Sequence, residues 1–187
     1  RDVVSWAVFL GSLGVSFVGL VALESSQVFG GRSGNRMLSL PYMIAVGMGL
    51  HNLGEGLAIG ASYASGEYTL SALLVAGFGL HNGTEGFGIV GAAGKTPMSW
   101  RDVFLLGLIA GLPTCVGTFL SGQGVSSYFS ICFYALAAGS LLYVVLSLTV
   151  MSYTATRRVQ VAAGMFAGIS LMYVTAMVLT LVSGVRS

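Results

Sequence analysis

Six long apolar segments, separated by short polar ones, limit what this chain can fold into. They span approximately Val3–Leu23, Leu38–Ser62, Thr69–Ala93, Asp102–Ser121, Tyr128–Ser152 and Val159–Ser183. Each is long enough to cross a hydrocarbon layer of about 30 Å as a helix that rises 1.5 Å per residue. None shows the alternation of polar and apolar residues that membrane β-strands require. The sequence therefore predicts an all-α integral membrane protein with six transmembrane helices.

Composition agrees with a chain that lies in lipid. Hydrophobic residues make up 55% of the sequence and charged residues 7%, and the mean hydropathy is +0.88. Soluble globular domains carry about 25% charged residues. Because no stretch suits a separate soluble domain, residues 1–187 are interpreted as a single transmembrane domain. The net charge of +2 arises from basic residues that flank the spans, so no nucleic-acid partner is expected.

The basic residues predict the orientation of the chain. Six of the eight fall in alternate loops: Arg32, Arg36, Lys95, Arg101, Arg157 and Arg158. The intervening loops at 65–68 and 121–127 contain no Lys or Arg. Lys and Arg are enriched in cytoplasmic loops. The basic side is therefore predicted to be cytoplasmic, with both ends of the chain on the outer side of a plasma or cytoplasmic membrane.

A repeated motif sits in the middle of two consecutive spans. GLHNLGEGLAIG at 49–60 recurs as GLHNGTEGFGIV at 79–90, with seven of twelve positions identical. The two copies contain both histidines and two of the six carboxylates of the chain. An acidic residue at the centre of a membrane helix costs roughly 2.5–3.5 kcal/mol on insertion scales, so such residues usually mark a functional site.

The spacing of the motif predicts one site made from two halves. Residues four apart share a helix face, so His51 and Glu55 project together, as do His81 and Glu85. The short loop between the two spans makes them antiparallel, which brings the motifs to the same depth. Imidazole, carboxylate and amide oxygen suit Zn²⁺, Fe²⁺, Mn²⁺ or Co²⁺, and the absence of thiolate argues against Cu(I). The predicted ligands are His51, Asn52, Glu55, His81, Asn82 and Glu85.

Two other readings of the same residues stay open. The histidines and glutamates could form a proton relay without metal, or could serve only as hydrogen-bond partners between helices. An enzyme is not expected, because the HNxxE pattern lacks the second histidine of a metalloprotease helix. Cys115 and Cys132 have no metal-ligand spacing and are interpreted as packing residues. Glu24 is expected to be a solvated carboxylate at the cytoplasmic interface.

At these motifs the chain resembles the ZIP (Zrt/Irt-like protein) family of divalent metal transporters. That family has eight helices, and its fourth and fifth carry HNxPEG motifs, which would be HNLGEG at 51–56 and HNGTEG at 81–86. The sixth, seventh and eighth helices are similar to AGLPTCVGTFLSG at 110–122, YALAAGSLLYVVL at 134–146 and GMFAGISLMYVTAMVLTL at 164–181. The first span would be the third family helix, so the resemblance implies that two N-terminal helices are missing from this sequence.

The resemblance implies a ZIP-like helix bundle and transport of a divalent metal ion, with zinc foremost and iron, manganese and cobalt also possible. It implies that the six motif residues are ligands for the ion as substrate. The chain departs from the family pattern at Gly54 and Thr84, where proline is usual, and at Ser147, where an acidic residue often follows the seventh-helix pattern. The alternative is a ZIP-like structural or accessory subunit of a larger membrane complex, and a homodimer is a further partner arrangement. Lipid and metal ions are the other expected partners.

Overall fold

The computed structural model describes residues 2–26, 39–124, 126–153 and 158–183. These ranges contain six α-helices and no strand: α1 (Val3–Ser25), α2 (Ser39–Ala64), α3 (Tyr68–Gly91), α4 (Trp100–Gly122), α5 (Ser127–Tyr153) and α6 (Arg158–Ser183). Every described helix end lies within two residues of the predicted one. The predicted start at Leu38 and the basic residues Arg32, Arg36 and Arg157 lie outside the described residues. The prediction of an all-α membrane protein is confirmed.

Four of the helices, α1, α4, α5 and α6, are long and apolar enough to cross a membrane by length and hydropathy alone. The other two, α2 and α3, are of similar length but carry the histidines and glutamates of the repeated motif. In α2, Glu55 is buried inside the protein and His51 is partly buried. Intramembrane polar residues usually face the interior of a bundle in this way.

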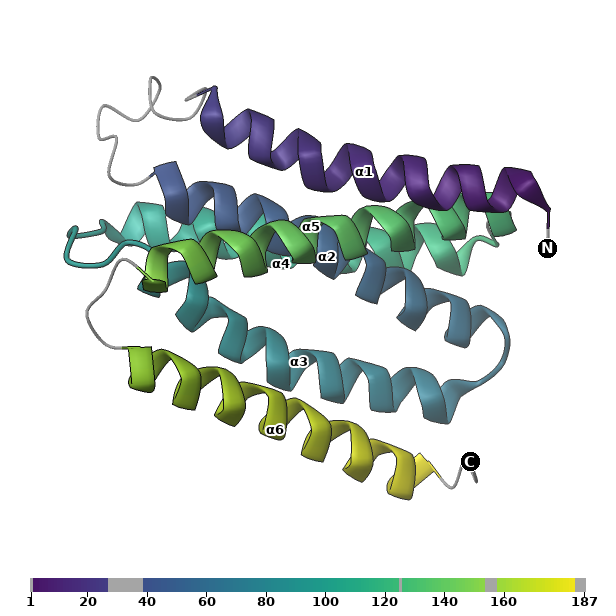
Figure 1. The fold of residues 1–187 in the computed structure, drawn as a ribbon. Helices are drawn as coiled ribbons and strands as arrows, with labels where there is room; N and C mark the ends of the chain where they lie inside the picture. The colour runs from purple at the N-terminus through teal and green to yellow at the C-terminus, as the bar shows by residue number, and fades with distance from the viewer. Residues whose placement is uncertain (1, 27–38, 125, 154–157, 184–187) are drawn as a thin grey trace.

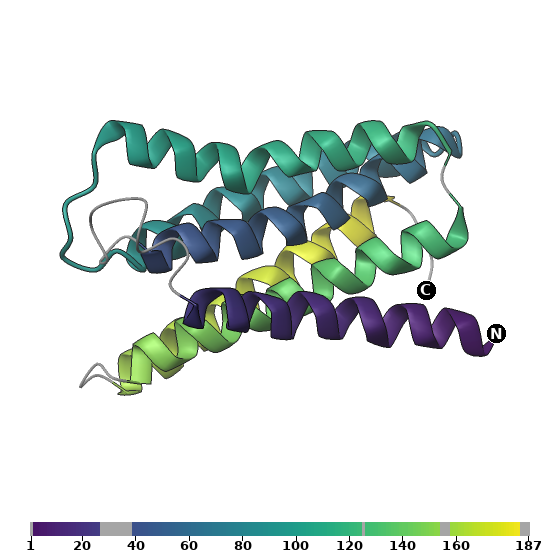
Figure 2. The ribbon, with the colours of Figure 1, turned by 90° about the horizontal axis from the view of Figure 1, so that it is seen from above.

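The helices alternate in direction, and α1 begins at the end of the bundle where α6 ends (Figure 1). The central helix is α2, which packs most extensively on α4 and also contacts α5 and α3. Next to this group, α1 lies along α5 (Figure 2). By contrast, α6 makes only limited contact, with α3 and α5. The architecture therefore consists of a closely packed part, α1, α2, α4 and α5, and a loosely packed part, α3 and α6.

Backbone contact holds α2 against α4. A Cβ atom on Gly56 of α2 would overlap the carbonyl oxygen of Thr114, and one on Gly117 of α4 would overlap the carbonyl oxygen of Leu53. Gly60 faces α4 in the same manner. Small residues at such positions let two membrane helices approach closely. This contact fixes the half of the repeated motif that α2 carries.

Polar contacts define two helix starts. Asp2 caps α1 by accepting a hydrogen bond from the Ser5 backbone N–H at 3.0 Å, and the Tyr128 hydroxyl donates to it at 2.6 Å. Hydrogen bonds from Ser5 and Tyr128 lower the pKa of Asp2 to about 2. At the other end of the bundle, Ser99 and Asp102 form a capping box that starts α4.

Candidate metal site

The repeated motif is divided between two antiparallel helices. His51, Asn52 and Glu55 lie on α2, and the corresponding residues of the second copy lie on α3. A tight turn joins the helices, with Gly66 at a φ of 79°, a backbone conformation that favours glycine. The turn brings the chain straight back, so the two motifs meet near the middle of their helices.

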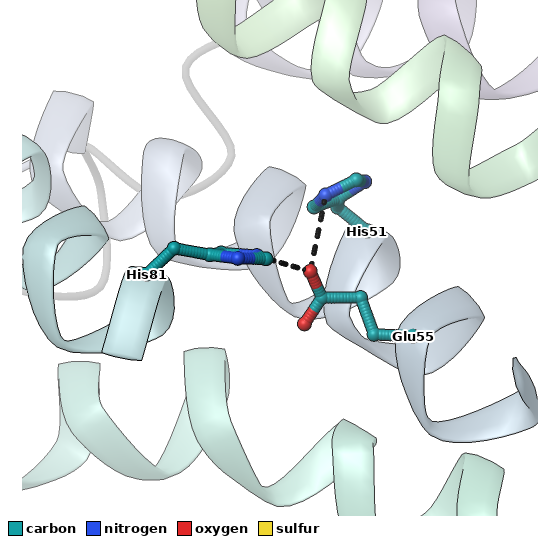
Figure 3. Close-up of side chains that lie close together, drawn as sticks. All are labelled: His51, Glu55 and His81. Atoms are coloured by element: carbon teal, nitrogen blue, oxygen red, sulfur yellow. Dashed lines mark hydrogen bonds and ion pairs between the residues drawn. The ribbon is translucent and has the colours of Figure 1, made fainter. Parts of the chain in front are cut away.

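Glu55 is the centre of the cluster. One of its carboxylate oxygens accepts a hydrogen bond from His81 Nε2 at 2.5 Å, and His51 Nε2 lies 3.6 Å from the same oxygen. Figure 3 shows the two imidazole rings pointing toward that oxygen from opposite helices. The other carboxylate oxygen accepts a hydrogen bond from Asn82 Nδ2 at 2.9 Å. Glu55 is only 6% exposed, so these hydrogen bonds take the place of the hydrogen bonds that water would make to its carboxylate.

The three side chains are close enough together to share a metal ion. Ligand atoms of His51, Glu55 and His81 all lie within 4.8 Å of one another. A tetrahedral zinc ion, with ligands about 2.0–2.2 Å away, would hold neighbouring ligand atoms roughly 3.3–3.5 Å apart. The His51–Glu55 pair is already near this separation. The His81–Glu55 pair would have to open by roughly 1 Å, exchanging its hydrogen bond for the ion.

Several buried polar atoms at the motif lack a hydrogen-bond partner in the described part of the chain. They are His51 Nδ1, Asn52 Oδ1, Asn82 Oδ1 and Glu85 Oε2. Leaving a buried polar atom unpaired costs about 1–3 kcal/mol, so a cluster of them needs an explanation. The three oxygens can donate electron pairs to a cation. The chemistry of the donor set therefore fits a positively charged ligand better than simple packing.

The two asparagines differ in their contacts. Asn52 is 2% exposed, and its Nδ2 donates to the backbone carbonyl of Ala110 on α4 at 3.1 Å. Asn82 donates instead to Glu55. Asn52 thus ties α2 to α4, whereas Asn82 ties α3 to α2. Each contact uses the amide nitrogen and leaves the amide oxygen available.

Glu85 belongs to the same cavity but not to the tight group of three. An open cavity of about 1030 Å³ is lined by His51, Glu55, His81 and Glu85, with mostly apolar residues of α5 and α6 around them. Glu85 lies close enough to Glu55 and His81 to interact electrostatically with both. Because two carboxylates face one cavity, a divalent cation would balance the charge of both.

The two positions where proline is usual in the family make different local contacts. A Cβ atom on Gly54 would lie 2.6 Å from the Cβ of Ala137, so α2 approaches α5 closely there. On α3, the Thr84 hydroxyl donates to the carbonyl of His81 at 2.7 Å. Ser147 donates to Glu24 and does not line the cavity. Glu24 is partly buried beside Ser147, which differs from the solvated position expected from the sequence.

Sequence reasoning missed the residues that α5 and α6 bring to the cavity. These include Tyr134, Ala137 and Leu141 of α5, and Gly164 and Gly168 of α6. On α5 the three residues recur at helical spacing along one face. That spacing indicates a buried face in general, and cannot show which other helix the face meets.

The fold and site together define an all-α membrane protein with a histidine–carboxylate cluster whose ligand atoms lie within 4.8 Å of one another. No family model matches the sequence, and no solved structure matches it. The chain is similar to the human zinc transporter ZIP4, at 34% identity over 131 residues, which are 68% of this chain. The matched region spans 20% of the length of ZIP4. This distant, partial homology supports a relationship to the ZIP proteins.

Proposed function

We propose that the protein is a ZIP-family transporter that moves a divalent transition-metal ion, zinc foremost, across the membrane through the Glu55 cluster. The observation that carries the proposal is the convergence of His51 and His81, from two antiparallel helices, on one oxygen of Glu55. The partial similarity to a protein named a zinc transporter supports it. In this proposal the protein transports and does not catalyse a reaction.

The ion would bind by displacing protons. His81 shares a proton with Glu55 in its hydrogen bond, and this proton must leave before both atoms can ligate the same ion. Glu85, Asn52 and Asn82 each have a buried oxygen without a partner and would complete the coordination shell. Metal uptake would therefore release protons, and affinity would fall as the pH is lowered.

The donor set favours borderline metal ions. Imidazole nitrogen with carboxylate and amide oxygen suits Zn²⁺, and also Fe²⁺, Mn²⁺ and Co²⁺. Neither cysteine belongs to the three-residue cluster, so the cluster lacks the thiolate that favours Cu(I). We propose a plasma or cytoplasmic membrane location, with the loop that carries Lys95 on the cytoplasmic side.

Uptake into vesicles tests the proposal. The full-length protein is reconstituted, and the entry of Zn²⁺ is followed with a fluorescent indicator trapped inside. We expect Glu55→Ala and Glu85→Ala each to abolish uptake, because each removes a carboxylate from the site. The matched control is Glu67→Ala, since Glu67 is an exposed carboxylate in the turn between α2 and α3. Undiminished uptake by both site variants, with intact folding, would refute the proposal.

A second candidate is a ZIP-like structural or accessory subunit of a larger membrane complex. It is favoured by α6, whose candidate span has 0% of its residues buried in the described structure. In this case we expect partner proteins to purify with the chain in fixed ratio, and the isolated chain to show no uptake. Metal-dependent uptake by the purified chain alone would count against it.

A further inference from the structure

A second polar cluster lies inside the closely packed part of the bundle, away from the metal site. It consists of Glu24 in the last turn of α1, with Tyr143 and Ser147 on α5. The cavity-lining residues of α5, such as Ala137 and Leu141, lie on the face opposite to Tyr143 and Ser147. The two clusters are therefore separated by the body of α5.

Hydrogen bonding within this cluster is long or absent. The Tyr143 hydroxyl is fully buried at 0% exposure and makes no hydrogen bond of normal geometry, although Glu24 and Ser147 lie close enough to interact with it. The Ser147 hydroxyl, 9% exposed as a residue, reaches Glu24 Oε2 only at 3.4 Å. Hydrogen bonds between oxygens are typically about 2.7–2.8 Å long. Packing thus holds the oxygens near one another but apart.

That separation matches two neighbouring ligands of one cation. An ion with oxygen ligands about 2.3–2.6 Å away holds adjacent octahedral ligands roughly 3.3–3.7 Å apart. Rigid neighbours keep Tyr143 in place, because its ring and Val144 pack against Gly47 of α2, where a Cβ atom would lie 2.7 Å from Val144. The Ser147–Glu24 pair therefore has the spacing of two ligands of one cation, and packing against α2 holds Tyr143 in the same cluster.

Charge selects the kind of ion. The donors are one carboxylate, one phenol and one hydroxyl, which are hard ligands without nitrogen or sulfur. Within the described residues, Glu24 has no basic side chain at ion-pair distance. A single positive charge would neutralise the carboxylate, whereas a divalent ion would leave a net charge in a mostly buried place. We propose that Glu24, Tyr143 and Ser147 form a separate binding site for a monovalent cation the size of Na⁺, between α1, α2 and α5.

Thermal unfolding of the full-length protein in detergent tests this site independently of metal transport. NaCl replaces N-methylglucamine chloride at constant ionic strength and pH. A ligand that binds only the folded state raises the unfolding midpoint in a saturable way. We expect Na⁺ to raise the midpoint of the native protein, and Glu24→Gln to abolish that rise. The control Glu67→Gln, at an exposed carboxylate, retains it.

Tyr143→Phe and Ser147→Ala provide the test if Glu24→Gln does not fold. Each removes one oxygen, so we expect the Na⁺ concentration at half-effect to rise about tenfold, which corresponds to about 1.4 kcal/mol of binding free energy. An Na⁺ response that survives in all three variants would overturn the proposal. The proposal would also be overturned if N-methylglucamine chloride raised the unfolding midpoint as much as NaCl does, or if micromolar Ca²⁺ saturated the effect in place of Na⁺. The same holds if lowering the pH without Na⁺ raised the midpoint by the same amount. None of these outcomes bears on zinc uptake through Glu55.

Discussion

The two copies of one motif occupy very different surroundings in this protein. In α2, Gly54 and Gly56 lie against the neighbouring helices α5 and α4 so closely that neither has room for a Cβ atom. In α3, the corresponding Thr84 is exposed, and Gly86 has no neighbouring atom within 4 Å of a built Cβ. Nearly the same hexapeptide is thus fixed on one side of the site and loosely held on the other.

Because of this difference, the two copies of the motif are expected to have different roles in the site. The α2 copy supplies Glu55, a buried acceptor held by the contact of α2 with α4. The α3 copy supplies His81, which would have to move by roughly 1 Å to exchange its hydrogen bond for a metal ion. Movement is easier for a helix with few close neighbours. We therefore expect the ion to adjust the position of α3 and leave α2 in place.

Replacing one glycine of each copy by alanine should give the largest difference in stability between the two copies. Gly56→Ala places a Cβ atom on the Thr114 backbone, and backbone cannot move aside as a flexible side chain can. We expect a loss of about 3 kcal/mol or more in unfolding free energy, at the upper end of typical overpacking effects. Gly86→Ala should instead stabilise the protein by about 0.5–1 kcal/mol, because the added Cβ meets no atom within 4 Å and alanine is favoured over glycine inside a helix. Unfolding of both variants in detergent measures this, and equal effects would contradict the comparison.

A smaller effect is expected from the asparagines. Asn52→Leu removes the hydrogen bond to Ala110, inside the closely packed part, and should lower global stability by about 1–2 kcal/mol. Asn82→Leu removes the bond that links α3 to Glu55, so it should speed amide hydrogen exchange in α3 while exchange in α2 and α4 stays slow. Hydrogen-exchange mass spectrometry distinguishes these results. Equal acceleration across all helices in Asn82→Leu would show that α3 is not independent.

The smallest effect concerns the end of the closely packed part where α1 begins. The pKa of Asp2 is lowered to about 2 in the folded protein from an ordinary value of 3.8. A lowered folded-state pKa gives stability that is present above the unfolded value and is lost as the pH falls from about 4 to 2. Asp2→Ala should therefore flatten the dependence of the unfolding midpoint on pH across this window. An unchanged slope would mean that its contacts with Ser5 and Tyr128 do not persist in solution.

Much of the fold follows from local sequence. The lengths of the apolar segments placed every described helix end within two residues, because a membrane span must pair all its backbone groups internally. The repeat also predicted that the two histidines would approach each other, since a short loop forces antiparallel helices and the motifs are near mid-helix. Whether the six motif residues bind metal remains a proposal.

What the sequence alone determined is the class of protein, the number of helices and the pairing of the two motifs, because hydrophobic length and helical periodicity act locally. Only the tertiary structure decided which glutamate is central, since Glu55 and Glu85 occupy equivalent positions in the repeat. Their difference arises from what packs behind each helix: α4 and α5 behind Glu55, and little behind α3. The same holds for Glu24, whose neighbours Tyr143 and Ser147 are more than a hundred residues away in the chain and meet it only when α1 lies along α5.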